Sequence, residues 1–206
     1  MFAEPLDREV IVEAQEHLRS RPLELDPRKK LPPMNGSPGK QIRVERQLKP
    51  GRALARSGDG GWDPLIREGR FQTGRFADDL VRACVRVYDG WNPDPMPEWV
   101  TAVPSLRAPA LVPDFGVRLA AALGLPYLEL LERTGDGPPQ REMENSSQQA
   151  ANVRGQFTVV AAPPFAPGLL VDDLWFSGWT LATIGAQLRE AGAGPVHPLV
   201  LSLAGR

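Results

Sequence analysis

Two adjacent carboxylates and a short loop with two hydroxyls are the residues of this 206-residue chain best suited to chemistry. Asp172 and Asp173 follow an apolar run, and Ser-Gly-Trp-Thr at residues 177–180 opens an amphipathic stretch. Carboxylates at the end of a strand can accept hydrogen bonds from vicinal hydroxyls, as on a ribose. The backbone N–H groups and dipole of a helix start, together with two hydroxyls, suit a phosphate monoester. The spacing therefore predicts a pocket for ribose 5-phosphate.

An apolar run that ends in two aspartates is also typical of the Mg²⁺-binding strand of P-loop ATPases. That interpretation requires the pattern G-x-x-x-x-G-K-[ST] elsewhere in the chain. The nearest match, GSPGKQ from Gly36, has the wrong spacing and ends in Gln instead of Ser or Thr. An ATPase motor within this chain is therefore excluded.

Hydrophobic periodicity predicts the elements that must position these residues. Helices are expected at residues 7–19, 74–91, 114–123 and 179–191, and strands at 41–45, 99–103, 127–131, 157–160, 168–171 and 196–202. Strands that alternate with helices predict an α/β fold with an open parallel sheet flanked by helices. Ligands bind beyond the carboxyl ends of the strands in such a sheet, where Asp172 and Asp173 are expected. Pro198 lacks a backbone N–H, so the last strand is predicted at the edge of the sheet.

The N-terminal quarter of the chain differs in composition from the rest. Residues 21–56 carry ten Lys and Arg against three acids, an excess of seven positive charges. We predict a small basic N-terminal subdomain or connector at residues 1–57, followed by the main domain at 58–206. A solvated basic surface is the plainer interpretation, and an accessory, salt-sensitive contact with DNA is the alternative. The stretch has no Phe, Trp or Tyr, the side chains that stack on single-stranded bases.

Composition narrows the remaining possibilities. A net charge of −1 excludes a globally basic nucleic-acid binder, and 42% hydrophobic residues can form a core. Cys84 is the only cysteine and lies on an apolar helical stripe, and the chain has only two histidines, so neither an internal disulfide nor a metal site is expected. No signal peptide and no window of roughly 18 apolar residues is found. We expect a cytoplasmic protein that makes no membrane contact.

The stretch LLVDDLWFSGWT resembles the phosphoribosyl pyrophosphate (PRPP) motif of type I phosphoribosyltransferases. Upstream, VPSLRAPALVPDFGVRLAAALGLP and PPQREMENSSQQAANVRGQF are similar to the ComF-like branch of that family, so the resemblance covers about residues 99–202. With LELDPRKKLPP and PGRALARSGDGGWDPLIREGRF added, nearly the whole chain resembles the C-terminal region of a bacterial subgroup of RecQ-like DNA helicases. Those proteins carry a phosphoribosyltransferase-like domain behind the motor.

The resemblance implies a role for each part of the motif. Asp172 and Asp173 would bind the ribose hydroxyls. The 5-phosphate would be bound by the loop residues Ser177, Gly178, Trp179 and Thr180. The pyrophosphate loop would consist of Ser105, Leu106 and Arg107, and a mobile lid in the polar segment 133–155 would include Gln140, Asn145 and Asn152. Mg²⁺ would arrive only with a diphosphate ligand, held by the oxygens of that ligand.

Two positions depart from the pattern of an active member of the family. Phe176 stands where Thr or Ser is usual, and Gln149 stands where the ComF-like lid usually has Arg. No residue is identifiable as a general base for an incoming nucleobase. The resemblance therefore implies an accessory domain of a helicase of DNA repair or recombination, which binds a phosphorylated ribose or nucleotide without turning it over. A free-standing PRPP-dependent phosphoribosyltransferase of salvage or competence-linked type is the alternative, and a retained fold with a vestigial pocket is the third possibility.

Overall fold

The structure, a computed structural model, describes residues 8–31, 39–105, 108–134 and 156–204. A five-stranded sheet forms its centre, in the order β1-β2-β7-β6-β3. The strands are β1 (Leu23–Leu25), β2 (Gly51–Arg56), β3 (Trp99–Ala102), β6 (Gly168–Trp175) and β7 (Val196–Leu203). Only β1 runs antiparallel to its neighbour. A separate antiparallel pair is formed by β4 (Leu131–Arg133) and β5 (Phe157–Val159).

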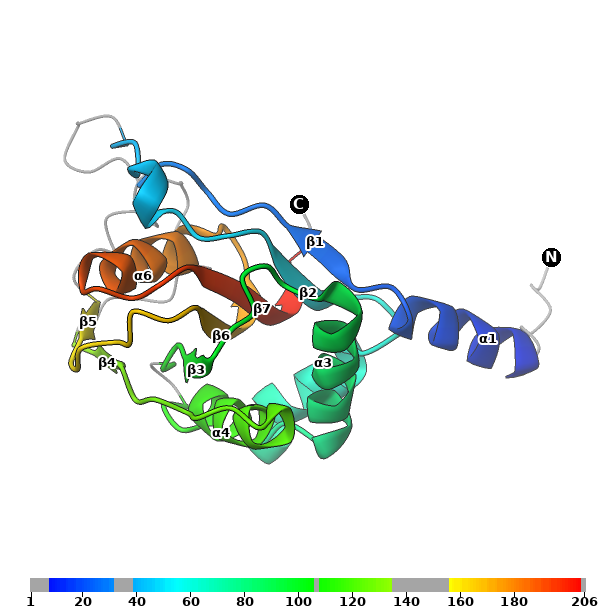
Figure 1. The fold of residues 1–206 in the computed structure, drawn as a ribbon. Coiled ribbons are helices and arrows are strands. Elements are labelled where there is room, and N and C mark those ends of the chain that lie inside the picture. Colours follow the sequence, from blue (N-terminus) through cyan, green and yellow to red (C-terminus); the bar gives the residue numbers. More distant parts are fainter. Residues whose placement is uncertain (1–7, 32–38, 106–107, 135–155, 205–206) are drawn as a thin grey trace.

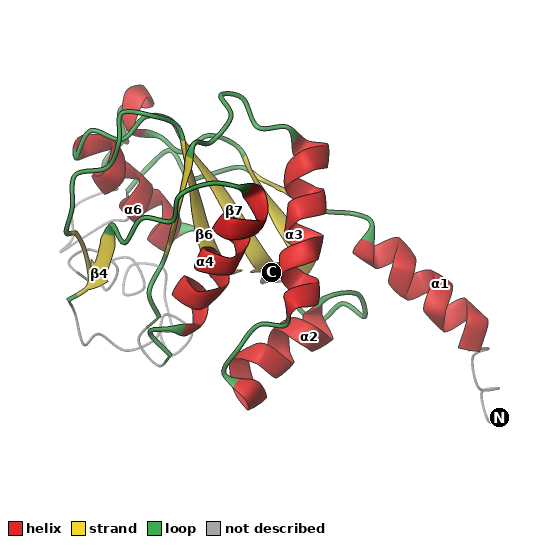
Figure 2. Cartoon of the chain, turned by 60° about the horizontal axis from the view of Figure 1, so that its bottom comes forward, coloured by secondary structure: helices red, strands yellow, loops and turns green. Residues whose placement is uncertain are grey.

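Helices cover both faces of this sheet, and each face has its own apolar core (Figure 1). One face packs against α2 (Asp63–Glu68), α3 (Asp78–Trp91) and α4 (Leu111–Leu123), which Figure 2 shows in front of the strands. The other face packs against α6 (Trp179–Glu190). The predicted α/β class, with a mostly parallel sheet flanked by helices, is confirmed.

The core on the α3 side contains the only cysteine. Phe76 and Phe115 meet there edge to face, with ring centroids 5.7 Å apart. Burial raises the pKa of the Cys84 thiol to about 12, because the thiolate would lose its hydration. A thiol with so high a pKa is a poor nucleophile, so Cys84 is a packing residue.

Helix α1 (Arg8–Arg19) differs from the others because it buries none of its residues. Figures 1 and 2 show it extending away from the body of the molecule. Within the described part of the chain, no helix is both long enough and apolar enough to cross a membrane.

The predicted edge position of the last strand is wrong, because β7 lies between β2 and β6. Its proline is tolerated there because β2 begins only at Gly51, and the register of β2 with β7 starts at Arg52 and Leu199. The segment before β2 already contacts β7 upstream of the proline, where the Lys49 N–H donates to the Val196 oxygen at 2.9 Å. The missing N–H of Pro198 therefore falls between this hydrogen bond and the first paired residues of β2. The side of β7 that faces β6 is paired throughout, with Pro198 opposite Leu170.

The N-terminal region also departs from the prediction. Residues 41–45 do not form a strand: Gln41 makes an isolated bridge to Lys30, and Val44–Arg46 is a 3₁₀ helix, η1. Strands β1 and β2 lie in the segment predicted to be a small basic subdomain or connector, and they extend the main sheet. The division into residues 1–57 and 58–206 stays a prediction, and the sheet runs across it.

Two of the remaining predicted strands also end elsewhere. Of residues 127–131, Tyr127 makes only a bridge to Val100, and β4 begins at Leu131. Strand β6 continues four residues beyond its predicted end at Val171. That extension places both candidate aspartates inside the strand, with consequences for the site.

Candidate functional site

The strands β2, β6 and β7 are parallel, and their carboxyl ends, at Arg56, Trp175 and Leu203, surround one cavity. Its volume is about 870 Å³, which lies within the range of about 300 to 1,000 Å³ usual for small-molecule sites. Other lining residues come from the basic N-terminal segment and from the predicted phosphate loop: Asp26, Pro27, Arg28, Lys29, Lys30, Phe176, Ser177, Trp179 and Ala204. The cavity therefore lies at the edge of the sheet where an α/β fold is expected to bind a ligand.

The predicted phosphate loop has a fixed backbone shape at the start of α6. Gly178 precedes the first helical residue, Trp179, and adopts a left-handed φ of 74°. A side chain at this position would also collide with the ring of Trp175, since an added Cβ would lie 2.5 Å from Cζ2 of that ring. Both the backbone angle and the close approach therefore require glycine. The structure places Ser177 and Trp179 in the wall of the cavity, and their role in binding phosphate stays a prediction.

Arg28 connects the N-terminal segment to this loop, a contact that sequence reasoning missed. Its guanidinium carbon lies 3.9 Å from the centroid of the Trp179 ring, and its Nε donates a hydrogen bond of 2.5 Å to the backbone oxygen of Ser177. The indole Nε1 of Trp179 is buried and has no hydrogen-bond partner among the described residues. Arg28 therefore contacts the loop at both Ser177 and Trp179 and ties the basic segment to this wall of the cavity.

The cavity is strongly cationic. Arg28, Lys29, Lys30 and Arg56 line it, and Asp26 is the one acidic residue among the lining residues described. No ion pair with another described residue engages the side chains of Lys29, Lys30 or Arg56. Cations gathered from two separate segments create a local positive field, and this field favours an anionic ligand.

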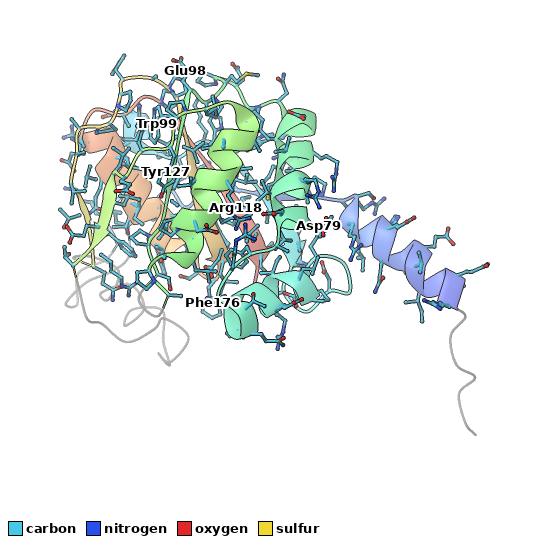
Figure 3. All side chains as sticks on the ribbon, turned by 90° about the horizontal axis from the view of Figure 1, so that it is seen from below. Asp79, Glu98, Trp99, Arg118, Tyr127 and Phe176 are labelled. Atoms are coloured by element: carbon cyan, nitrogen blue, oxygen red, sulfur yellow. The ribbon has the colours of Figure 1, made fainter. Side chains whose placement is uncertain are left out.

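Phe176 also lines the cavity, with 44% of its surface exposed. Figure 3 shows it at the opposite end of the molecule from Glu98 and Trp99, as expected for a residue that follows the carboxyl end of β6. The position where the resemblance expects Thr or Ser thus presents an aromatic ring to the ligand space and no hydroxyl.

The aspartate pair lies apart from the residues that line the cavity. Asp172 and Asp173 are 8% and 7% exposed inside β6, where their side chains leave the strand on opposite faces. The backbone N–H of Asp173 donates to Oδ1 of Asp172 at 2.8 Å. The structure therefore keeps the predicted ribose-binding carboxylates next to the phosphate loop in the chain but covers them.

Two arginines partly offset the charge of this pair. Nε of Arg70 lies 3.1 Å from Oδ2 of Asp173. Arg70 belongs to a short π-helix, η2 (Gly69–Thr73), an element that is rare and frequent at functional sites. Arg133 of β4 is half-buried and donates to Oε1 of Gln156 at 2.8 Å, and the charge of Asp172 acts on it. Neither arginine carries a sequence signal, since no periodicity or spacing links it to the aspartates.

Burial raises the pKa of both carboxyls. For Asp172 the pKa lies well above its usual value, because burial and then the charge of Asp173 both disfavour ionisation. Burial also raises the pKa of Asp173, but the charge of Arg70 opposes that rise. The charge of Arg70 thus favours the ionised form of Asp173, whereas burial and the charge of Asp173 disfavour the ionised form of Asp172.

The other predicted site residues fall mostly outside the described part of the chain. Ser105 is half-buried and follows the carboxyl end of β3, as predicted for a pyrophosphate loop. Leu106 and Arg107 lie outside the described residues, as do the predicted lid residues Gln140, Asn145, Gln149 and Asn152. Across the described residues, no three His, Cys, Asp or Glu side chains gather as a metal site would require.

Comparisons with known proteins find similarity to solved structures only at low sequence identity. No protein-family model and no curated protein matches the chain. An adenine phosphoribosyltransferase structure is 18% identical, with 92% of this chain and 89% of that chain covered and a TM-score of 0.43. The adenine phosphoribosyltransferase of Saccharomyces cerevisiae, complexed with an imino-altritol bisphosphate and adenine, is 16% identical over 93% and 89%, with a TM-score of 0.45. With TM-scores below 0.5, these similarities do not establish what this chain does, and the site itself has to indicate its function.

Proposed function

We propose that this chain binds a phosphorylated ribose, either a phosphoribosyl compound or a nucleotide, with its 5-phosphate in the cationic cavity. The observation that carries the proposal is the meeting of a glycine-shaped helix start with four cations at the carboxyl ends of three parallel strands. The first-turn N–H groups of α6 and the helix dipole would meet the phosphate oxygens.

The two aspartates would contribute less to this binding than the loop. Hydroxyls of the ligand would have to replace the contact between Arg70 and Asp173 before they could reach that carboxylate. The raised pKa of Asp172 also disfavours its ionised form, which is the stronger hydrogen-bond acceptor. Most of the affinity would therefore come from the phosphate, and ribose without phosphate would bind weakly.

Binding without turnover fits the residues that surround the cavity. Phe176 removes one hydroxyl from the phosphate loop and places a ring in the cavity. Transfer of a ribosyl group requires stabilisation of a ribosyl cation and of the departing pyrophosphate, which is mainly an electrostatic task. The raised pKa of Asp172 opposes the negative charge that would stabilise that cation. Where the ligand carries a diphosphate, Mg²⁺ would enter as part of it, held by the diphosphate oxygens.

Isothermal titration calorimetry with ribose 5-phosphate, AMP and PRPP tests the proposal, with unphosphorylated ribose as the control ligand. We expect binding of the three phosphorylated ligands and none of ribose. The R28A variant should weaken binding at least about fivefold, because a charged hydrogen-bonding group is lost. The matched variant R82A removes a charge from an exposed site on α3 and should bind like the wild type. Absence of heat with all three phosphorylated ligands would contradict the proposal.

The free-standing enzyme is distinguished by a second measurement. Incubation with PRPP, Mg²⁺ and each common nucleobase should release no pyrophosphate. Release that disappears in the D173N variant would instead support a phosphoribosyltransferase.

The helicase context rests on the sequence resemblance alone. The basic N-terminal segment does not distinguish a helicase domain from a free-standing enzyme, because Arg28, Lys29 and Lys30 line the cavity and would serve the ligand in either context. An accessory role beside a DNA helicase motor therefore stays a prediction. The test is whether helicase motifs precede Met1 in the reading frame.

A further inference from the structure

We propose that the cavity receives the 5′-phosphorylated end of a single-stranded nucleic acid. This inference rests on the proposed function, since the terminal nucleotide of such a strand carries the same group, a 5-phosphate monoester on a pentose. A mononucleotide ends at its 3′ hydroxyl, whereas a strand continues there into further phosphates and bases. The residues of the cavity other than the phosphate loop therefore determine whether a mononucleotide or a strand is the better ligand.

The charge of the cavity exceeds what one phosphate requires. Four lining cations against the single carboxylate of Asp26 leave an excess of three positive charges, four minus one. A phosphate monoester carries about two negative charges near neutral pH. The first phosphate would be held by the loop and Arg28, so Lys29, Lys30 and Arg56 remain for phosphates that follow it.

The positive surface also continues away from the cavity. Residues 29–31 pair with residues 40–42: the N–H of Leu31 donates to the Lys40 oxygen at 2.7 Å, and the N–H of Ile42 donates to the Lys29 oxygen at 2.9 Å. In this antiparallel pairing Lys30 lies opposite Gln41, exposed Lys40 lies opposite Leu31, and exposed Arg43 follows Ile42 at the Lys29 end. A mononucleotide would end inside the cavity, whereas the successive phosphates of a strand could meet these further cations on either side of Lys29 and Lys30.

The fold supplies the aromatic ring that the basic segment lacks. Phe176 lines the cavity and is the exposed aromatic of its wall, whereas Trp175 and Trp179 are buried. Arg28 already covers one face of the Trp179 ring. Bases of a single strand stack on exposed aromatic side chains without regard to sequence. Phe176 is therefore placed to stack a base while Lys29 and Lys30 meet the neighbouring phosphates.

Fluorescence anisotropy of a short oligothymidine labelled at its 3′ end tests this inference, with strands that carry either a 5′-phosphate or a 5′-hydroxyl. At low salt the 5′-phosphorylated strand should bind about tenfold more tightly, because the hydroxyl strand leaves the phosphate loop empty. The F176A variant should weaken both strands about tenfold through lost stacking. K29A/K30A should weaken both strands and reduce the salt slope by about two. The control R82A/R86A, which removes two charges from α3, should bind both strands like the wild type.

The outcomes separate this inference from the proposed function. Competition by AMP that releases the phosphorylated strand and abolishes its advantage would support both. Equal binding of the two strands, or no binding of either, would overturn the inference, and calorimetric binding of AMP would then leave the proposed function standing. If neither AMP nor a strand binds, both fail. Phe176, Lys29 and Lys30 are exposed, so thermal unfolding should show that these variants fold.

Discussion

The aspartate pair and the phosphate loop are neighbours in the chain, but they lie in opposite physical environments. Asp172 and Asp173 are buried in β6, where the charge of Asp173 raises the pKa of Asp172 and Arg70 forms an ion pair with Asp173. The loop that follows opens onto a cavity whose cations are exposed to water. Buried charges must be neutralised within the protein, whereas exposed cations are hydrated and need no partner before a ligand binds. The motif thus has a closed half, the buried pair Asp172 and Asp173, and an open half, the phosphate loop at residues 177–180. Loss of function in one half does not require its loss in the other.

The largest effect is expected from a substitution of the glycine in the open half of the motif. The G178A variant forces a left-handed backbone angle on a residue with a side chain and drives its Cβ into the Trp175 ring. We expect the free energy of unfolding to fall by about 2–4 kcal/mol and phosphate binding to be lost. Urea denaturation and calorimetry measure the two effects. The control is G74A, at a similar φ of 68° with open space around it, which should cost only about 1–2 kcal/mol and leave binding intact. Equal losses in both variants would contradict the role given to Trp175.

The next effect tests the closed half. The R70A variant leaves the Asp173 carboxylate buried without its ion-pair partner, and we expect a loss of about 1–3 kcal/mol of unfolding free energy at pH 7. Adding D173N should recover much of that loss, because the buried carboxylate that Arg70 contacts is then replaced by a neutral amide. The control R67A removes an exposed charge from α2 and should change stability by less than about 0.5 kcal/mol. A loss in R70A that D173N does not reduce would show that Arg70 acts through packing alone.

The pH dependence of stability distinguishes the two halves further. The pKa of Asp172 is raised in the folded protein, so the folded state binds more protons than the unfolded state between the unfolded and the folded pKa. The stability contributed by this group is full below the unfolded pKa of about 4 and is lost as the pH rises through the folded pKa. D172N should flatten this fall and raise the unfolding free energy at pH 7 by on the order of 1 kcal/mol. The control D89N, at an exposed position on α3, should keep the wild-type profile. An unchanged pH profile of stability in D172N would contradict the raised pKa of the Asp172 carboxyl in the folded protein.

The smallest effect is expected from restoring the missing hydroxyl. F176T should tighten binding of ribose 5-phosphate about two- to tenfold through one additional hydrogen bond. The same change should weaken binding of a single strand, because the stacking ring is gone. F176L, which adds no hydroxyl, should leave the affinity for ribose 5-phosphate unchanged. A strand that binds F176T as tightly as the wild type would remove Phe176 from the strand site.

The sequence predicted the start of α6 well because its signals are local. Glycine before an amphipathic stretch marked the start of α6 at Trp179, where the structure has it. The end of β6 could not be read in the same way, because the pairing of β6 with β7 extends the strand through both aspartates and overrides their polar character. Arg70 and Arg28 were missed for a related reason. Their contacts join segments 103 and 149 positions apart, and no local pattern encodes such a contact.

The central position of β7 was also beyond the reach of local reasoning. Pro198 is a sound signal for an edge, but it is overridden where the partner strand begins just beyond the proline. Strands β1 and β2 are short, and a segment rich in Pro and Lys concealed them. Local composition indicates whether a segment tends to form a strand. The order of the strands in the sheet depends on the packing of the whole fold.

The pairing of β2 with β7 has a practical consequence for anyone who divides this chain. A fragment of residues 58–206 would lack β2 and would turn β7 from an interior strand into the border of the sheet. Seven of the eight residues of β7 are buried in the full chain, so the fragment would present a long apolar ribbon of unpaired backbone groups. Such ribbons recruit other chains, and the fragment would aggregate where the full chain does not. The same cut would separate Arg28, Lys29 and Lys30 from Trp179, so neither piece would contain the complete wall of the cavity.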